Sequence, residues 1–199
     1  MKIAVGILLC VVAVVAVALH STGDGDRALT SLKCLLHGGG HCHCMDRYRF
    51  NASTTLKTLT AAQADFRAND RDGDKVAQFW RADVAGLYLL SPKGGERIKL
   101  IELSTAAADD RAVTDLSPVA VKSPKQGYWF RAILHVDEDA RAPDPDRFAF
   151  CAYPDTPQSG KYIFIVDENN RIYRSEAKGR RGIDVFPTQE ELKQWTKLD

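Results

Sequence analysis

The sequence lacks an excess of either charge. It contains 27 lysines and arginines against 26 aspartates and glutamates, so the formal net charge is +1 at pH 7. Proteins that hold nucleic acid through its phosphates carry a basic surface, and acidic tails carry the opposite charge. This composition fits neither class, and we expect no nucleic-acid partner.

Catalytic signatures are also missing. The sequence has no G-x-S-x-G, no H-E-x-x-H, no phosphate-binding loop and no dinucleotide-binding glycine pattern. We therefore expect no catalysis. One alternative stays open, a thiol-dependent enzyme with Cys151 as nucleophile and His135 as base. A cysteine flanked by Phe150 and Tyr153 in a strand is, however, more often a small core residue than a reactive thiolate.

Long apolar runs are limited to one, which follows Lys2 and extends over residues 3–19 without a charge. Its length is near the lower limit of about 17 to 25 residues that spans a bilayer as a helix. We expect residues 1–20 to be a membrane anchor, with the rest of the chain outside the cytoplasm because Lys2 favours a cytoplasmic N-terminus. The alternative is a signal peptide cleaved after Ala18, which would make the protein secreted.

Cysteine is scarce, and it concentrates in a predicted linker over residues 21–50. Within HGGGHCHC, zinc or copper could be held by His37, His41, Cys42, His43 and Cys44. The pairs of a zinc knuckle are absent, so a disulfide among Cys34, Cys42 and Cys44, or free thiols, is the favoured interpretation outside the cytoplasm, and redox exchange is a further alternative. A metal-binding module that uses this cluster is the first alternative function.

An acidic loop is the second candidate metal site. Asp70, Asp72 and Asp74 have the spacing of the first three ligands of a calcium-binding EF-hand loop. The glycine and the glutamate expected at positions 6 and 12 are replaced by Lys75 and Arg81. The alternative interpretation is a polar turn that ends a helix.

We expect one folded domain over residues 51–199. A helix beginning at Asn51 or Ser53 would bury an apolar stripe, with Gln63 among the residues that point elsewhere. That stripe consists of Ala52, Leu56, Leu59, Ala62 and Phe66. Residues 102–115 are expected to form a short surface helix, and residues 187–195 a final helix that brings Leu192 and Trp195 to the core.

From Gly127 onward the hydrophobic period changes from 3.6 to 2. The segments GYWFRAILHV, RFAFCAY, KYIFIVDE and RIYRSEA each predict a strand, and Asn169-Asn170 predicts a tight hairpin between the last two. The predicted fold class is α+β, with the amphipathic helix packed on a three- or four-stranded antiparallel meander.

The order of apolar segment, amphipathic helix, variable middle and meander resembles the layout of type IV pilins and pseudopilins. Over about residues 54–199 the chain is also similar to bacterial envelope proteins of uncharacterised function, most clearly in Ala152-Tyr153-Pro154, Ser159-Gly160 and FIVDENNRIYR. The resemblance implies a pilin-like fold, protein partners in the cell envelope and no catalytic residues. The glutamate that follows a pilin cleavage site is absent after Gly6. We expect a membrane-anchored structural or interaction domain that needs no cofactor.

Overall fold

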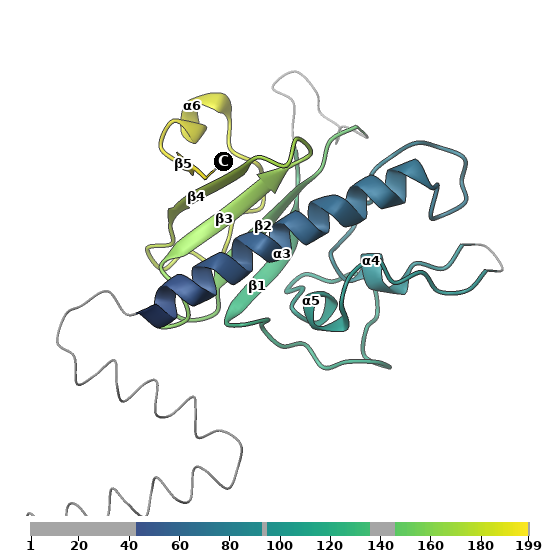
Figure 1. Cartoon of the computed structure of the whole chain (residues 1–199), viewed down its shortest axis with the longest axis horizontal. Coiled ribbons are helices and arrows are strands. Elements are labelled where there is room, and N and C mark those ends of the chain that lie inside the picture. Colours follow the sequence, from purple (N-terminus) through teal and green to yellow (C-terminus); the bar gives the residue numbers. More distant parts are fainter. Residues whose placement is uncertain (1–42, 93–94, 136–145, 199) are drawn as a thin grey trace, which may run out of the picture. The chain divides into compact units, whose positions relative to one another are not determined.

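A computed structural model describes residues 43–92, 95–135 and 146–198 (Figure 1). The chain divides into two compact units, Met1–Cys44 and Met45–Asp199, and nearly all described residues belong to the second. The predicted anchor and most of the predicted linker lie outside the described residues. Among the residues that are described, no helix has the length and apolar character needed to cross a membrane.

The longest helix among the described residues, α3 (His43–Ala68), lies across one face of the sheet (Figure 1). Its predicted apolar stripe is confirmed, because all five residues from Ala52 to Phe66 are at most 5% exposed. The predicted start is wrong, since the helix begins at His43 and Asn51 lies inside it. Residues 45–50 contain neither glycine nor proline, so nothing in the local sequence stops the helix at Asn51.

Gln63 on α3 is a second correction, because this residue is fully buried instead of facing solvent. Its side-chain Oε1 accepts a hydrogen bond of 2.9 Å from the backbone N–H of Trp80, and its Nε2 donates to the carbonyl of Trp80. The backbone of Trp80 therefore satisfies both ends of the buried amide. The pair of bonds fixes the segment after the acidic loop against the helix.

The sheet has five strands in the order β1-β2-β3-β4-β5, and every neighbouring pair is antiparallel. The strands are β1 (Tyr128–Ile133), β2 (Ala149–Pro154), β3 (Tyr162–Asp167), β4 (Ile172–Glu176) and β5 (Thr196–Lys197). The α+β class and the antiparallel meander are thus confirmed. The fifth strand was not predicted, because two residues carry no periodic pattern.

The predicted hairpin between β3 and β4 is also confirmed. Asn170 has the left-handed backbone (φ 58°) that asparagine tolerates better than most residues. The carboxylate of Asp167 accepts hydrogen bonds from the backbone N–H groups of Asn169 and Arg171, at 3.1 and 3.0 Å. Local side-chain bonds of this kind favour a turn over continued strand.

Both faces of the sheet are covered. The face toward α3 contributes Phe130, Phe150 and Phe164 to the main core. The opposite face forms a smaller core with Ile163 and Ile165, covered by the C-terminal segment that includes helix α6 (Gln189–Leu192). Two-sided covering explains why all six residues of β2 are buried.

Two short helices, α4 (Gly86–Leu89) and α5 (Leu103–Ala107), connect α3 to the sheet and pack on each other (Figure 1). The prediction of a surface helix over residues 102–115 is wrong in two ways. The helix has only five residues, and much of it is buried. Thr105, Ala106 and Ala107 of α5 are buried. Small side chains let a helix approach its neighbours closely, so an alanine-rich segment can lie inside as readily as outside.

The outer edge of β1 is occupied by two loop segments. Phe130 donates its N–H to the carbonyl of Ala108 and accepts from the N–H of Asp110. Farther along, Leu134 donates to the carbonyl of Asp184 and accepts from the N–H of Phe186. Residues 108–110 and 184–186 therefore act as short partners of this edge.

The N-terminus of α6 supplies a stability prediction. Thr188 caps it, with its side chain accepting from the N–H of Glu191 while the Glu191 carboxylate accepts from the N–H of Thr188. Replacing Thr188 by alanine is expected to lower the free energy of unfolding by about 1 kcal/mol in urea titrations, because both reciprocal bonds are lost. Glu190→Gln, an exposed change one residue before Glu191, is the control and should cost under about 0.5 kcal/mol. Equal effects of the two changes would contradict the capping role.

Candidate functional site

The predicted histidine and cysteine site falls largely outside the described residues. This applies to His37, His41 and Cys42, and also to Cys34. His43 and Cys44 are the first two residues of α3, which continues without interruption. Zinc or copper binding and the disulfide both stay predictions.

The structure brings the three aspartates of the acidic loop together. One carboxylate oxygen from each of Asp70, Asp72 and Asp74 lies within 4.8 Å of the others. Much of their hydrogen-bonding capacity is used by the turn itself, because Asp70 accepts from the N–H of Lys75 and Asp74 accepts from the N–H of Val76. Burial, followed by the neighbouring carboxylates, raises the pKa of Asp72. The proximity is as predicted, and binding of calcium stays a prediction.

The loop geometry accounts for the same residues without an ion. Asp70, Gly73 and Lys75 all have positive φ angles, of 47°, 72° and 66°. Aspartate and glycine are suited to such conformations, and aspartate side chains bond to nearby backbone N–H groups. Asp70 and Asp74 therefore act as turn-forming groups where α3 ends, whereas Oδ1 of Asp72 is buried without a hydrogen-bond partner.

Cys151 does not have the geometry of a nucleophile. It is completely buried in β2, and burial raises the pKa of its thiol to about 12. It lies opposite Arg131 in the sheet register. Arg131 precedes His135 by four residues, which corresponds to roughly 13 Å along a strand. His135 instead stacks on Phe186, with ring centroids 4.6 Å apart. Both residues lie on the side of the smaller core, and the offset along the strands keeps apart the two side chains that the enzyme alternative needs to bring together.

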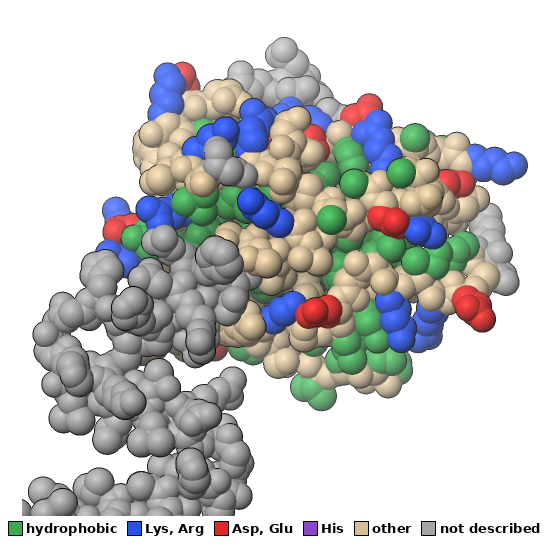
Figure 2. All heavy atoms as spheres, viewed as in Figure 1, with side chains coloured by type: hydrophobic (Ala, Val, Ile, Leu, Met, Phe, Trp, Pro, Cys, Tyr) green, Lys and Arg blue, Asp and Glu red, His purple; other side chains and the backbone are tan. Residues whose placement is uncertain are grey.

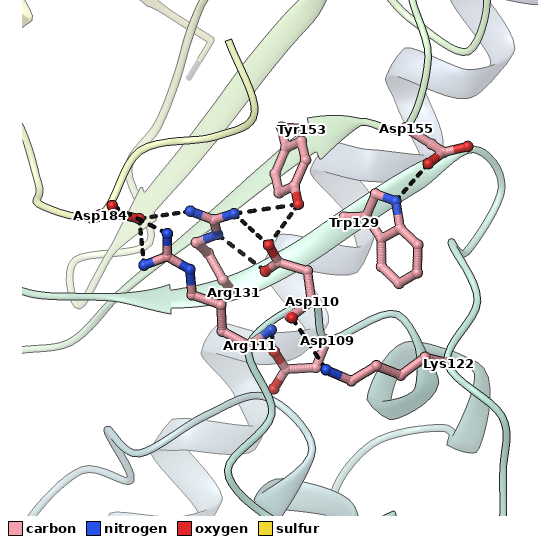
Figure 3. Close-up of polar contacts among 9 residues, drawn as sticks. All are labelled: Asp109, Asp110, Arg111, Lys122, Trp129, Arg131, Tyr153, Asp155 and Asp184. Atoms are coloured by element: carbon pink, nitrogen blue, oxygen red, sulfur yellow. Dashed lines mark hydrogen bonds and ion pairs between the residues drawn. The ribbon is translucent and has the colours of Figure 1, made fainter.

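One extensive polar cluster in the described part of the chain contains four side chains from distant positions, which we call the Arg131 network: Asp110, Arg131, Tyr153 and Asp184 (Figure 3). Arg131 on β1 donates to both carboxylate oxygens of Asp110, with 3.0 Å between Nε and Oδ1. Its Nη1 lies 2.6 Å from Oδ1 of Asp184, and the Tyr153 hydroxyl donates to Asp110 at 2.6 Å. Arg111 contacts Asp184 from the solvent side at 2.8 Å.

The charges in this region balance, with Arg131 and Arg111 facing Asp110 and Asp184. Burial of Arg131, whose side chain is 5% exposed, lowers its pKa, but hydrogen bonding to Asp110 and Tyr153 and the nearby negative charge together outweigh burial and raise the pKa. Burial raises the pKa of Tyr153 to about 12, so its phenol stays protonated at neutral pH. A neutral phenol between satisfied charges has no free capacity for acid–base chemistry. The network holds the segment before residue 185 against the second face of the sheet.

Two further buried aspartates hold loops instead of a ligand. Asp109 accepts from the backbone N–H groups of Val84 and Ala85 at 2.6 and 2.9 Å, and burial raises its pKa to about 6. Asp83 accepts from the N–H groups of Gly86, Val113 and Thr114. These carboxylates take the place of secondary structure for segments that lack it.

The larger of two described hollows is a groove of about 410 Å³ lined by residue 106, residues 112–117 and residues 120–122. Its lining includes Val113 and Val121, which are 75% and 85% exposed. Binding sites for small molecules usually combine apolar walls with several convergent polar groups. The lining contains no aromatic residue, and its two charged residues are Asp115 and Lys122. Lys122 is already directed to the carbonyl of Asp110.

Sequence patterns did not identify the buried polar residues. Arg131 lies in an alternating strand, where an arginine is ordinarily taken to face solvent. One signal was present, because AFCAY in β2 has no charged or strongly polar residue at any position, which indicates a strand covered on both faces. An arginine opposite such a strand must then be buried and paired.

Comparisons of the chain with family models, with curated proteins and with solved structures find no match.

Proposed function

We propose that this chain is a membrane-anchored, extracytoplasmic structural or interaction domain with the layout of a pseudopilin. The observation that carries the proposal is that α3, which follows the segment containing the apolar residues 3–19, is itself part of the domain core. Leu56 and Leu59 of this helix are fully buried. The first described helix after the expected anchor is therefore held within the folded domain.

The polar chemistry of the domain also supports a non-catalytic role. Asp83 and Asp109 bind backbone N–H groups, and Arg131 is saturated by carboxylates. Catalytic groups need unused hydrogen-bonding capacity or a pKa suited to proton transfer next to a pocket that holds substrate. These buried groups stabilise loops, and the surface is left for contacts with partners.

Fractionation of cells that make the protein tests the proposal. We expect the full chain in the pellet after an alkaline carbonate wash, with an intact mass that corresponds to Met1 through Asp199. Protease added outside the cytoplasmic membrane should digest the domain. The control is Val11→Arg combined with Val14→Arg, which places two charges in the apolar run at a cost of roughly 3 kcal/mol each and should release the chain from the pellet.

Two results would contradict this function. A mass that begins at Leu19 would show that the apolar segment is a cleaved signal, and the protein would be secreted. Retention of the doubly substituted chain in the carbonate-washed pellet would show that residues 3–19 are not what holds it there.

A further inference from the structure

The direction of α3 defines the end of the sheet at which the chain enters the folded domain. At its C-terminal end, Phe66 packs on Trp80 with ring centroids 5.9 Å apart. Arg67 pairs there with Asp146, which precedes β2, at 2.8 Å. From Ala52 to Phe66 the helix covers about 21 Å, which is about the length of a six-residue strand. The helix therefore begins at the opposite end, where β2 ends and β3 starts (Figure 1).

That end of the sheet carries a cluster of exposed basic residues, which we call the basic rim: Lys161, Lys178, Arg180 and Arg181. Lys161 directly precedes β3, and the other three belong to the loop that follows β4. The loop is joined to Lys161 by a 2.9 Å hydrogen bond from the N–H of Ala177 to the Lys161 carbonyl. Figure 2 shows several basic side chains at this end of the domain.

The loop of the basic rim has a defined shape. Arg180 donates to the carbonyl of Glu176 at 2.9 Å and to Oγ of Ser175 at 3.1 Å, which folds the loop back on β4. Gly179 has φ 78°, and nothing lies within 4 Å of the position where a Cβ would stand. The side chains of Lys178 and Arg181 are exposed on either side of this turn.

Charge is distributed unevenly between the two ends of the domain. Residues 177–182 contain three basic residues and no acidic one, and Glu176 pairs with Lys161 at 3.4 Å. The acidic loop with Asp70, Asp72 and Asp74 lies at the other end, where α3 finishes. Arg67, Arg71 and Lys75 lie beside that loop and balance much of its charge, whereas residues 177–182 hold no acidic residue that would balance the basic rim.

We propose that the basic rim contacts the anionic phospholipid headgroups of the membrane. The proposal rests on the proposed anchoring of residues 3–19. Residues 20–42 would reach at most about 80 Å if fully extended, so the tether alone allows the domain to touch the membrane or to stand away from it. Electrostatic attraction then favours the position in contact with the membrane, because each basic residue near an anionic membrane strengthens binding by about fivefold.

Protection from trypsin measures this contact directly, because trypsin cleaves after lysine and arginine. The full chain is reconstituted in nanodiscs of neutral phosphatidylcholine, or of the same lipid with phosphatidylglycerol, and digested briefly. Cleavage after Arg180 and Arg181 is expected to be about tenfold slower in the anionic discs. Cleavage after Arg97 is the internal reference and should not change. High salt should remove the protection, because it screens exposed charges.

Two variants make the test specific. Lys161→Gln with Lys178→Gln removes two charges of the basic rim and keeps both scored cleavage sites, so the protection should be lost. Lys75→Gln with Lys99→Gln removes the same charge from other loops, and it should keep the protection.

The possible outcomes separate the two proposals. Equal cleavage after Arg180 and Arg181 in both kinds of nanodisc, with the chain incorporated in each, would overturn the lipid contact and leave the anchoring intact. Failure to incorporate into either disc would contradict the anchoring instead. The full chain would then be sedimented with anionic vesicles, where pelleting that depends on the rim lysines supports the contact and its absence overturns it.

Discussion

Replacing Asp83 by alanine is expected to lower the free energy of unfolding by about 4 kcal/mol. The side chain is 1% exposed, and its carboxylate accepts from the N–H groups of Gly86, Val113 and Thr114 and from the indole of Trp80. Each buried donor left without a partner costs about 1 to 3 kcal/mol. Few other single side chains in the described residues satisfy so many backbone groups from two separate loops.

Urea denaturation of the Asp83→Ala variant measures this effect, with Asp115→Ala as the matched control. Asp115 also accepts from a backbone N–H, that of Ser117 at 3.0 Å, but at an exposed position. Water can replace a carboxylate there, so we expect a loss below about 1 kcal/mol. If the Asp83 variant is no less stable than the Asp115 variant, the loops around α4 do not depend on this carboxylate.

The second large effect is expected at Arg131. Methionine at this position keeps the length of the aliphatic stem but leaves Asp110 and Asp184 without their inner partner. Breaking a buried ion pair from one side costs about 3 to 5 kcal/mol, because the remaining carboxylate stays partly desolvated. Asp110 is the main source of this cost, since its side chain is 17% exposed against 57% for Asp184.

Arg111→Met is the control for the Arg131 experiment. Arg111 pairs with the same Asp184, but its side chain is 57% exposed, and exposed pairs are worth about 0 to 1 kcal/mol. A double-mutant cycle that adds Asp110→Asn then isolates the pairing energy from lost packing. An Arg131 variant as stable as the Arg111 variant would mean that the network contributes charge balance without stability.

The elements that could be predicted from sequence depend on short-range periodicity. The stripe of α3 repeats every three or four residues, and the strands alternate every two, so each pattern is complete within its own segment. The hairpin at Asn169-Asn170 is likewise local. The start of α3 was missed because the triple glycine suggested a linker, although the residues after Met45 contain no helix breaker.

The buried polar residues could not be predicted, because their partners are distant in sequence. Gln63 bonds to Trp80, 17 positions away, and Arg131 reaches Asp184 over 53 positions. An isolated glutamine or arginine in a periodic segment is assigned to solvent unless its partner is known. The acidic loop was the opposite case, since three aspartates within five residues must lie close together in any turn.

The occupied edge of β1 restricts how copies of this domain can associate. An open edge strand would let a second chain extend the sheet through its backbone. Here a second chain would first have to displace residues 108–110 and 184–186, and with them the charged side chains Asp110 and Asp184. Assembly at this side of the sheet must therefore proceed through the matching of side-chain surfaces, which can be selective in a way that backbone pairing is not.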